Sequence, residues 1–587
     1  MQPLRIFFLL YLLQILSAKS ISAQCSIDEV SLEKKTERAT FIIEGKIIEK
    51  KSFFNKQHNF IYTCNKLQVY KYFKNKPDYK IIYIITEGGM VNNKLLSVSP
   101  SVKLDTGVVG LFMLINSSIQ FPDDSSSQTY SLYSGVQGFI KYNLKDKTAS
   151  TPFKTYTNIT TELYKTLTDK LGKSFNSVTP FDINNISTPT FNLRATTAVI
   201  SSFSPTVISA GTYSVLTING SGFGSEQGNS TVNFKNTNNG GQTYIQPFPT
   251  QYLSWSNTQI KVQVPSDAGT GQIQVDIGTP VTSRDTLRIS FSELNASNDS
   301  NSEAETKIVG LNYEGGITWR MNVNLNADTA AKASFIRAFS TWKCTTFINW
   351  NLGANTLIDS AVNDSVNVIT FGNVNNSTEG ILGVCYSYWG QCESSDWILE
   401  EADILINPNI SWEYGPSFPS NSKFDFQSVM LHELGHGHQL GHVTDETNLM
   451  NYSIARGNVR RTLNASNIDA ANDILNRSTA QNYCNYPIFK LITASNCSDL
   501  YIVNQDSSFL IFPNPSNGYF NLAIPSTKQN LNIYVYTSLG EMLTTITTNQ
   551  SSNYVSFDLS EYPSGIYFLR IDNGEQTTFR KLLLVKK

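Results

Sequence analysis

Four of the chain's five histidines lie within eleven residues, from His432 to His442. His432 and His436 are four residues apart, so on an α-helix their imidazoles project from one face, about one turn apart. Two ring nitrogens placed in this way can bind one tetrahedral metal ion such as Zn²⁺. The spacing therefore predicts a helix that ends at a metal site, and no other feature of the sequence constrains the fold as strongly.

The residues beside these two histidines predict what the metal site does. Glu433 follows the first histidine, where a glutamate can act as a general base and then as a general acid. Zinc enzymes usually keep three protein ligands and one open position. His438 is a poor third ligand because it would face about 200° around the helix from His436. His442 can bind if the chain leaves the helix after Gly437 and turns back. We expect the ligands to be His432, His436 and His442.

This spacing resembles the long zinc signature of the metzincin metalloproteases, which a methionine turn follows. Residues 448–452 follow at the distance typical of matrixins, so the resemblance implies that Met450 is the hydrophobic floor beneath the metal. Tyr452 resembles the tyrosine of astacins and serralysins, which implies a catalytic role in stabilising the transition state. Gln439 stands where the family has a glycine, and a left-handed backbone there would be costly.

The residues around the cluster predict a mixed α+β domain. Strands are expected at 316–324, near 347–350, and at 366–371, 380–386 and 402–406, and helices at 330–342, from Phe426 with Asp425 as N-cap, and at 466–475. This order resembles a matrixin catalytic domain over residues 307–480. By that resemblance the strand 381–386 is the edge that pairs with an extended substrate peptide, through Leu382, Gly383 and Val384. The alternative is a plain edge strand.

The N-terminal residues indicate export. Residues 1–23 carry one arginine, an apolar core and Ala23 before Gln24, a pattern that favours a secretory signal peptide. No later stretch is long enough for a transmembrane helix, so we expect no stable membrane span in the mature chain. The 587 residues suggest several domains, and the net charge of −2 does not favour nucleic acid as a partner.

Two β-rich modules are expected before the histidine cluster. Residues 24–165 alternate in strand fashion and predict a β-barrel-like domain, similar to netrin-type OB-fold domains. This domain could be an inhibitory prodomain or a spacer, and we favour the spacer. Residues 198–292, with glycine turns within 216–224, resemble the immunoglobulin-like IPT/TIG domain, which acts as a spacer or in binding. An acidic, low-complexity linker is expected at 292–305.

The C-terminal residues 506–587 resemble the C-terminal sorting domain of the type IX secretion system. The resemblance rests on the segments 512–518, 533–540, 559–570 and the basic end 581–587. The turn residues fit a small β-sandwich. The resemblance implies a bacterium of the Bacteroidota type, recognition by outer-membrane secretion machinery, and a secreted or cell-surface location. The alternative is a terminal β-module without a sorting role.

Seven cysteines in an exported chain permit disulfide bonds, whose connectivity cannot be deduced from sequence. Neighbours along the chain suggest the pairs Cys385 with Cys392, Cys484 with Cys497 and Cys25 with Cys64, which would leave Cys344 over. Acidic residues such as Asp403 and Glu413 could bind Ca²⁺, and the sequence does not decide this.

Together these features predict a multidomain, secreted or surface-exposed zinc endopeptidase. Its fold would be an α+β metzincin catalytic domain flanked by all-β modules, its cofactor Zn²⁺ and its substrates proteins or peptides. The alternative is a surface adhesin or glycan-binding protein whose metzincin-like domain is inactive. The intact Glu433 and histidines favour the protease.

Overall fold

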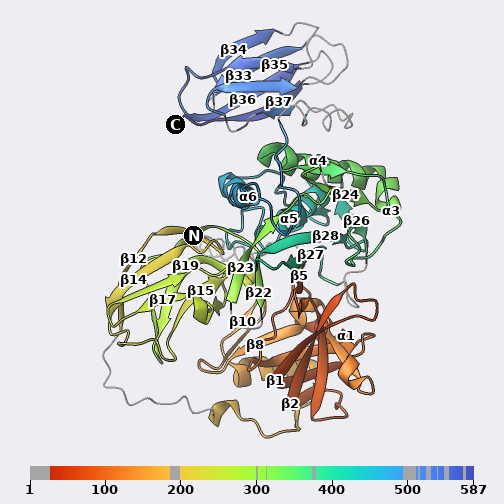
Figure 1. Cartoon of the computed structure of the whole chain (residues 1–587), viewed down its shortest axis with the longest axis vertical. Coiled ribbons are helices and arrows are strands. Elements are labelled where there is room, and N and C mark those ends of the chain that lie inside the picture. The colour runs from red at the N-terminus through yellow and green to blue at the C-terminus, as the bar shows by residue number, and fades with distance from the viewer. Residues whose placement is uncertain are drawn as a thin grey trace, which may run out of the picture. The chain divides into compact units, whose positions relative to one another are not determined.

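The computed structural model describes residues 27–185, 198–298, 302–312, 314–372, 379–493 and 497, and most of 510–586. Within the last range, 513, 515, 524–530, 538–539, 548–553 and 573–576 are left out. The chain divides into two compact units, Met1–Cys497 and Ser498–Lys587 (Figure 1). The predicted signal peptide and Cys25 lie outside the described residues. None of the described helices is long and apolar enough to cross a membrane.

The N-terminal module is a closed β-barrel. Its strands are β1 (Phe41–Phe54), β2 (Ile61–Lys74), β3 (Ile81–Glu87), β6 (Val109–Asn116) and β7 (Thr129–Leu132). β1 pairs with β2 and also with β6, while β3 pairs with β7 and β7 with β6, so the five strands close on themselves. Apolar side chains such as Ile43, Phe112 and Leu114 fill the interior. The β-rich character expected here is confirmed, and the likeness to OB-fold domains stays a prediction.

The second module is a sandwich of two four-stranded sheets. One sheet has the order β12 (Val199–Ser204), β14 (Val215–Ser221), β18 (Gln259–Gln263) and β17 (Tyr252–Trp255). The other has the order β16 (Tyr244–Ile245), β15 (Thr231–Asn236), β19 (Ala268–Asp276) and β20 (Pro280–Thr282). Alternate residues of the strands, such as Leu216, Ile218 and Val262, point into the shared core.

The histidine cluster belongs to a domain that consists of a mixed sheet with helices packed on it. The sheet runs β25 (Trp350–Leu352), β24 (Ile317–Met321), β26 (Asn367–Phe371), β28 (Trp397–Ile406) and β27 (Gly383–Gln391), with β27 antiparallel to β28. The helices are α3 (Val323–Ala327), α4 (Thr329–Thr346), α5 (Phe426–Gly437) and α6 (Ala465–Ser478). The predicted strand at 316–324 ends early because Asn322 caps α3. The other predicted elements are present with shifted ends.

The strand predicted to be a sheet edge is covered along part of its length by a strand of the N-terminal module. On one side β27 pairs with β28, and on the other it pairs with β5 (Lys94–Ser99), which belongs to the N-terminal module (Figure 1). β5 forms a hairpin with β4 (Gly89–Val91) that leaves the closed barrel. Within the histidine domain β27 is the last strand of the sheet, as predicted, and Leu382, Gly383 and Val384 lie outside the pairing with β5. The sequence of β27 gives no sign of this partner strand almost 300 residues upstream, and the predicted substrate role of the edge stays a prediction.

The predicted acidic, low-complexity linker at 292–305 is folded over its described residues. β22 (Asn295–Asn298) and β23 (Ser302–Ile308) form a hairpin, and β23 extends the sheet by pairing with β28. Glu293 is fully buried and forms an ion pair of 2.6 Å with Arg477 of α6. The linker prediction was therefore wrong, because it was based on polarity and missed that the acidic side chain has a buried partner.

The predicted disulfide pairs are also wrong. The structure joins Cys392 to Cys484, with the two Cα atoms 5.4 Å apart. Cys385, Cys497 and Cys64 are buried free thiols. Cys392 lies past the end of β27, where the chain that follows α6 returns to the sheet. Proximity along the sequence therefore misled the pairing.

The C-terminal unit is a small β-sandwich over its described residues. One sheet contains β31 (Leu510–Phe512), β32 (Tyr519–Ala523) and β35 (Tyr554–Asp558). The other contains β34 (Met542–Thr547), β33 (Asn532–Thr537), β36 (Gly565–Asp572) and β37 (Thr577–Leu584). Leu522, Ile533 and Leu569 are among the buried residues between the sheets.

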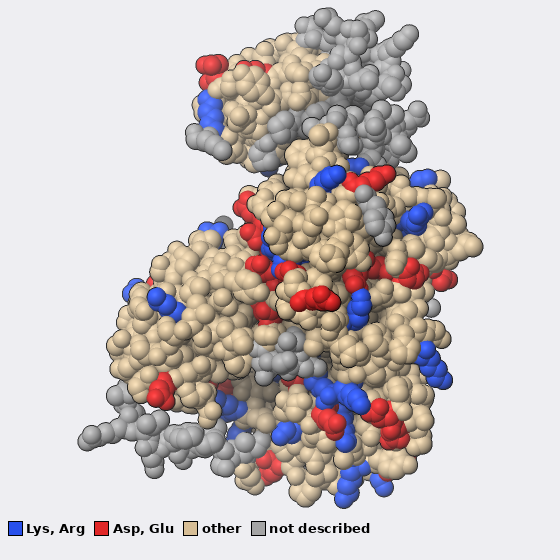
Figure 2. All heavy atoms as spheres, in the orientation of Figure 1, with Lys and Arg blue, Asp and Glu red and all other residues tan. Residues whose placement is uncertain are grey.

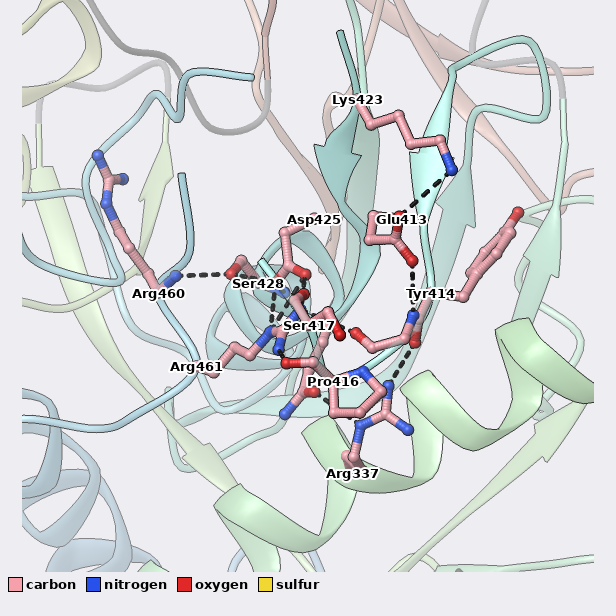
Figure 3. Close-up of polar contacts among 12 residues, drawn as sticks. Arg337, Glu413, Tyr414, Pro416, Ser417, Lys423, Asp425, Ser428, Arg460 and Arg461 are labelled. Atoms are coloured by element: carbon pink, nitrogen blue, oxygen red, sulfur yellow. Dashed lines mark hydrogen bonds and ion pairs between the residues drawn. The ribbon is translucent and has the colours of Figure 1, made fainter. Parts of the chain in front are cut away.

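A buried carboxylate fixes the start of the histidine helix. Asp425 is the N-cap of α5, as predicted, and accepts a hydrogen bond of 2.8 Å from the Ser428 backbone N–H. Arg461 Nε donates to the same carboxylate at 2.9 Å, and its guanidinium also reaches the Gly415 and Ser417 carbonyls at 2.9 and 3.0 Å (Figure 3). The start of α5 is thus tied to the chain that follows the methionine segment.

We expect Asp425→Ala to lower the free energy of unfolding by about 3 kcal/mol, because it removes a helix cap and leaves a half-buried arginine without its anion. Asp425→Asn keeps the cap and should lose less. Urea unfolding followed by tryptophan fluorescence measures both, since all seven tryptophans lie in the first unit. An alanine variant as stable as the wild type would show that this network does not hold α5.

Candidate metal centre

Three histidine side chains meet at the end of α5. His432 and His436 lie on the helix, and His442 lies on the chain after it. All three are buried, and their candidate ligand nitrogens lie within 4.8 Å of one another. The Nε2 atoms of His436 and His442 are 3.1 Å apart. Within the part of the chain that the structure describes, this is the one group of three or more metal-ligating side chains.

Backbone carbonyls orient the two helical histidines. His432 Nδ1 lies 2.8 Å from the Leu449 carbonyl oxygen, and His436 Nδ1 lies 2.8 Å from the Leu440 carbonyl oxygen. A carbonyl oxygen can only accept, so each Nδ1 must carry the proton. Each Nε2 therefore presents its lone pair to the centre of the group, which is the form in which histidine binds metals.

The third histidine is oriented by the second β-module. His442 Nδ1 lies 2.7 Å from the side-chain oxygen of Asn238, on the turn after β15. The amide group of Asn238 also bonds Asp267, which pairs with Lys103 of the N-terminal module. Because a carboxylate accepts, the Asn238 nitrogen must face Asp267 and its oxygen must face His442. Sequence reasoning missed Asn238, which lies 204 residues upstream of the ligand and outside any motif.

Burial keeps these imidazoles neutral. It lowers the pKa of His436 to about 4 and holds the pKa values of His432 and His442 well below their usual range. Neutral rings with protonated Nδ1 atoms point three lone pairs at one another, and His432 Nε2 is a buried atom without a hydrogen-bond partner. A cation removes this repulsion. The nitrogens, their number and their outer partners fit Zn²⁺.

Gln439 makes the turn that brings His442 back. α5 ends at Gly437, and Gln439 has a left-handed backbone with φ of 71°. Its buried side chain accepts a hydrogen bond of 2.7 Å from Trp389 Nε1 and donates one of 3.2 Å to the His436 carbonyl. The turn expected from the family's glycine is therefore present. The side-chain hydrogen bonds of the glutamine offset the backbone cost.

Glu433 and Met450 each pack closely against a glycine near the histidine group. A Cβ on Gly383 of β27 would come within 3.0 Å of Glu433 Cγ, so the carboxylate side chain packs on that strand. A Cβ on Gly435 would lie 2.4 Å from Met450 Sδ, so only glycine lets the methionine approach the helix from below. Leu382 and Val384 flank Gly383 and are buried. The structure brings together the predicted base, the methionine and the start of β27.

Two predicted side chains point elsewhere. Tyr452 is buried with its hydroxyl donating 3.1 Å to the carbonyl of Pro152 in the N-terminal module, and burial raises its pKa to about 12. In this arrangement the structure does not direct the hydroxyl to the histidines. The ring centroid of His438 lies 5.4 Å from that of Trp342, and this buried histidine is outside the group of three ligand side chains, as expected.

The acidic residues named for calcium are engaged in other contacts. Asp403 accepts a hydrogen bond of 2.9 Å from the Val368 N–H, and Glu413 pairs with Lys423 at 3.2 Å. Neither belongs to a group of three metal-ligating side chains among the residues described. On the face shown in Figure 2, acidic and basic residues are interspersed.

Two parts of the chain match known families. Residues 510–586 match the secretion system C-terminal sorting domain, and residues 198–289 match the IPT/TIG domain. The chain carries a type IX sorting domain. It is therefore a secreted or cell-surface protein that uses outer-membrane secretion machinery. Neither match covers the histidine cluster.

No curated protein matches the chain. A solved structure titled "Biofilm associated protein - BSP domain" is similar with 10% identity and a TM-score of 0.12, over 93% of this chain and 82% of that chain. A TM-score this low carries no argument about fold or function.

We expect Gln439→Ala to lower the free energy of unfolding by about 2–3 kcal/mol, because it keeps the left-handed backbone and leaves the Trp389 N–H buried without a partner. Gln439→Gly loses the same hydrogen bonds but relieves the backbone, so it should be about 1 kcal/mol more stable than the alanine variant. Urea unfolding measures both. Equal stabilities would contradict a strained turn at this position.

Asn238→Ala should weaken zinc binding by about 10–100-fold, because His442 loses the acceptor that fixes its proton on Nδ1. Asn238→Asp keeps an acceptor oxygen for His442 but loses the donor to Asp267, so it separates the two contacts of Asn238, and we expect it to bind zinc more tightly than the alanine variant. Competition with a chromogenic chelator at constant pH measures the zinc Kd. If alanine leaves the Kd unchanged, the IPT/TIG module does not support the ligand.

Proposed function

We propose that residues 307–480 are a zinc-dependent endopeptidase of the metzincin type, similar to matrixins, acting on proteins or peptides outside the cell. The convergence of three neutral histidine Nε2 atoms, with Glu433 next to His432 on the same helix, carries this proposal. The ligands are His432, His436 and His442. The methionine under the site and the left-handed turn before the third ligand support the same family.

The protein side chains have separate roles in the proposed reaction. When bound, zinc lowers the pKa of a water molecule and polarises the scissile carbonyl. Glu433 takes the proton of the attacking water and passes it to the leaving amine. Its packing on Gly383 holds the carboxylate beside the strand along which the substrate lies. A catalytic role for Tyr452 requires that its hydroxyl leave the Pro152 carbonyl.

The substrate backbone would pair with β27. A strand that accepts a partner by backbone hydrogen bonds binds peptides with little dependence on their sequence. In the structure this side of β27 does accept an antiparallel strand, β5, along Cys385 to Gly390. Leu382, Gly383 and Val384 continue β27 toward Glu433, so a peptide in this position runs toward the proposed base.

We expect Glu433→Ala to abolish casein cleavage, by at least about 10³-fold, while one zinc ion per chain stays bound, because the proton carrier is lost and the three ligands are kept. Casein cleavage and metal content are measured on the same zinc-loaded, secreted preparation. A chelator should abolish cleavage by the wild type and zinc should restore it. Cleavage by the alanine variant at the wild-type rate would favour the adhesin or glycan-binding alternative, with a contaminating protease as the source.

A further inference from the structure

The N-terminal module reaches into the histidine site with a strand and a hydroxyl group. We propose that this module is an intramolecular inhibitor, in which β5 occupies the place of the substrate peptide and Ser99 covers the metal site. The inference rests on the proposed function. It assigns an inhibitory role to a module whose sequence favoured a spacer.

The first support is the pairing of β5 with β27. Six residues of β5, from Lys94 to Ser99, lie opposite Gly390 to Cys385 in antiparallel register. A strand edge has one row of outward N–H and C=O groups, so a second peptide cannot use the row that β5 fills. A substrate can pair with this part of β27 only after β5 leaves.

The second support is the end of β5. Ser99 Oγ lies 3.0 Å from His436 Nε2, the nitrogen that the geometry assigns to the metal. Because His436 Nδ1 carries the proton, the serine hydroxyl is the donor in this contact. The side chain of Ser99 therefore stands where a substrate's reacting group would have to enter. The same module holds the Tyr452 hydroxyl through the Pro152 carbonyl.

The third support is the packing around the strand pair. Leu96 and Val98 of β5 are buried in one apolar cluster with Tyr386 and Tyr388 of β27. Lys94 bonds both carboxylate oxygens of Glu400 at 2.6 Å, Tyr386 donates to Glu87 at 3.0 Å, and Arg456 pairs with Asp28 at 2.7 Å. Arg456 follows the methionine segment in the sequence. The N-terminal module therefore contacts both β27 and the chain after Met450.

A spacer does not require these features. A spacer joins two domains, and it needs no strand continuity, no buried apolar pair and no hydroxyl group on a metal ligand. Tethering also makes β5 a strong competitor, because a linked segment acts at an effective concentration on the order of millimolar. An untethered peptide must exceed that concentration or bind more tightly.

The test loosens β5 in the full chain. Val98→Asp places a charge in the apolar cluster, and Ile81→Asp, on an exposed position of the same module, is the matched control. Hydrogen exchange of the β27 amides reports strand release without any need for metal or activity. In Val98→Asp we expect β27 to exchange at least tenfold faster, and zinc-loaded chain to cleave casein and bind a peptide hydroxamate at least tenfold better. The control should match the wild type.

If tryptophan fluorescence shows that Val98→Asp does not fold, a second variant tests the proposal. Ser97→Cys with Ser387→Cys places two thiols directly opposite each other on β5 and β27. Peptide mapping verifies the bond, because Cys385 lies nearby on β27. Mapping of the reduced chain must show that the engineered bond is open while Cys392–Cys484 is intact, and this chain should bind the hydroxamate at least tenfold more tightly than the same chain oxidised. Equal binding in the two states, or none in either, overturns the inhibitor.

The outcomes separate the two proposals. A wild-type chain that cleaves casein as fast as Val98→Asp overturns the inhibitor and keeps the protease. A Val98→Asp chain that exchanges faster at β27 but cleaves no casein overturns the protease, and with it the inhibitory role of β5. Unchanged exchange at β27 in a folded Val98→Asp chain overturns the inhibitor whatever the activity.

Discussion

Three imidazole lone pairs that point at one another are the constraint on which the first unit depends. A hydrogen-bond acceptor at Nδ1 orients each imidazole. The Leu449 carbonyl orients His432, the Leu440 carbonyl orients His436, and the side-chain amide of Asn238 in the IPT/TIG module orients His442. Without a cation such a centre is repulsive, so the surrounding chain must hold it in place. This explains why α5, the turn at Gln439 and a whole neighbouring module meet at one point.

The parts of this centre that a local pattern encodes could be predicted. The helix spacing predicted that His432 and His436 share one face of α5, Asp425 predicted the start of α5, and the departure at Gln439 marked the position of the left-handed turn. The long-range parts could not be predicted. Asn238 is an ordinary asparagine in a turn, and Cys392 bonds a cysteine 92 residues away. Their roles arise only when separate segments fold against each other.

The folded segment before β24 shows why composition is a poor guide to flexibility. Residues 292–305 are polar and acidic, yet Glu293 is buried against Arg477 and β23 extends the sheet. Burial raises the pKa of the Glu293 carboxyl to about 8 and Arg477 opposes that shift. The Leu294 N–H also donates 2.8 Å to the Gln439 carbonyl. The connection to the IPT/TIG module thus packs against the turn that leads to His442.

The topology of the N-terminal module would allow the proposed inhibition to be reversed. Its barrel closes through β1, β2, β3, β7 and β6, and β5 belongs to the other sheet, so the β4–β5 hairpin can leave β27 without opening the barrel. An uncovered β27 would expose a strand edge with Tyr386 and Tyr388, a hazard for aggregation during export. One contact therefore protects the edge and closes the site. The exposed Lys94–Glu400 ion pair contributes little to the stability of the contact between β5 and β27. Release of β5 must therefore separate the apolar side chains of the cluster.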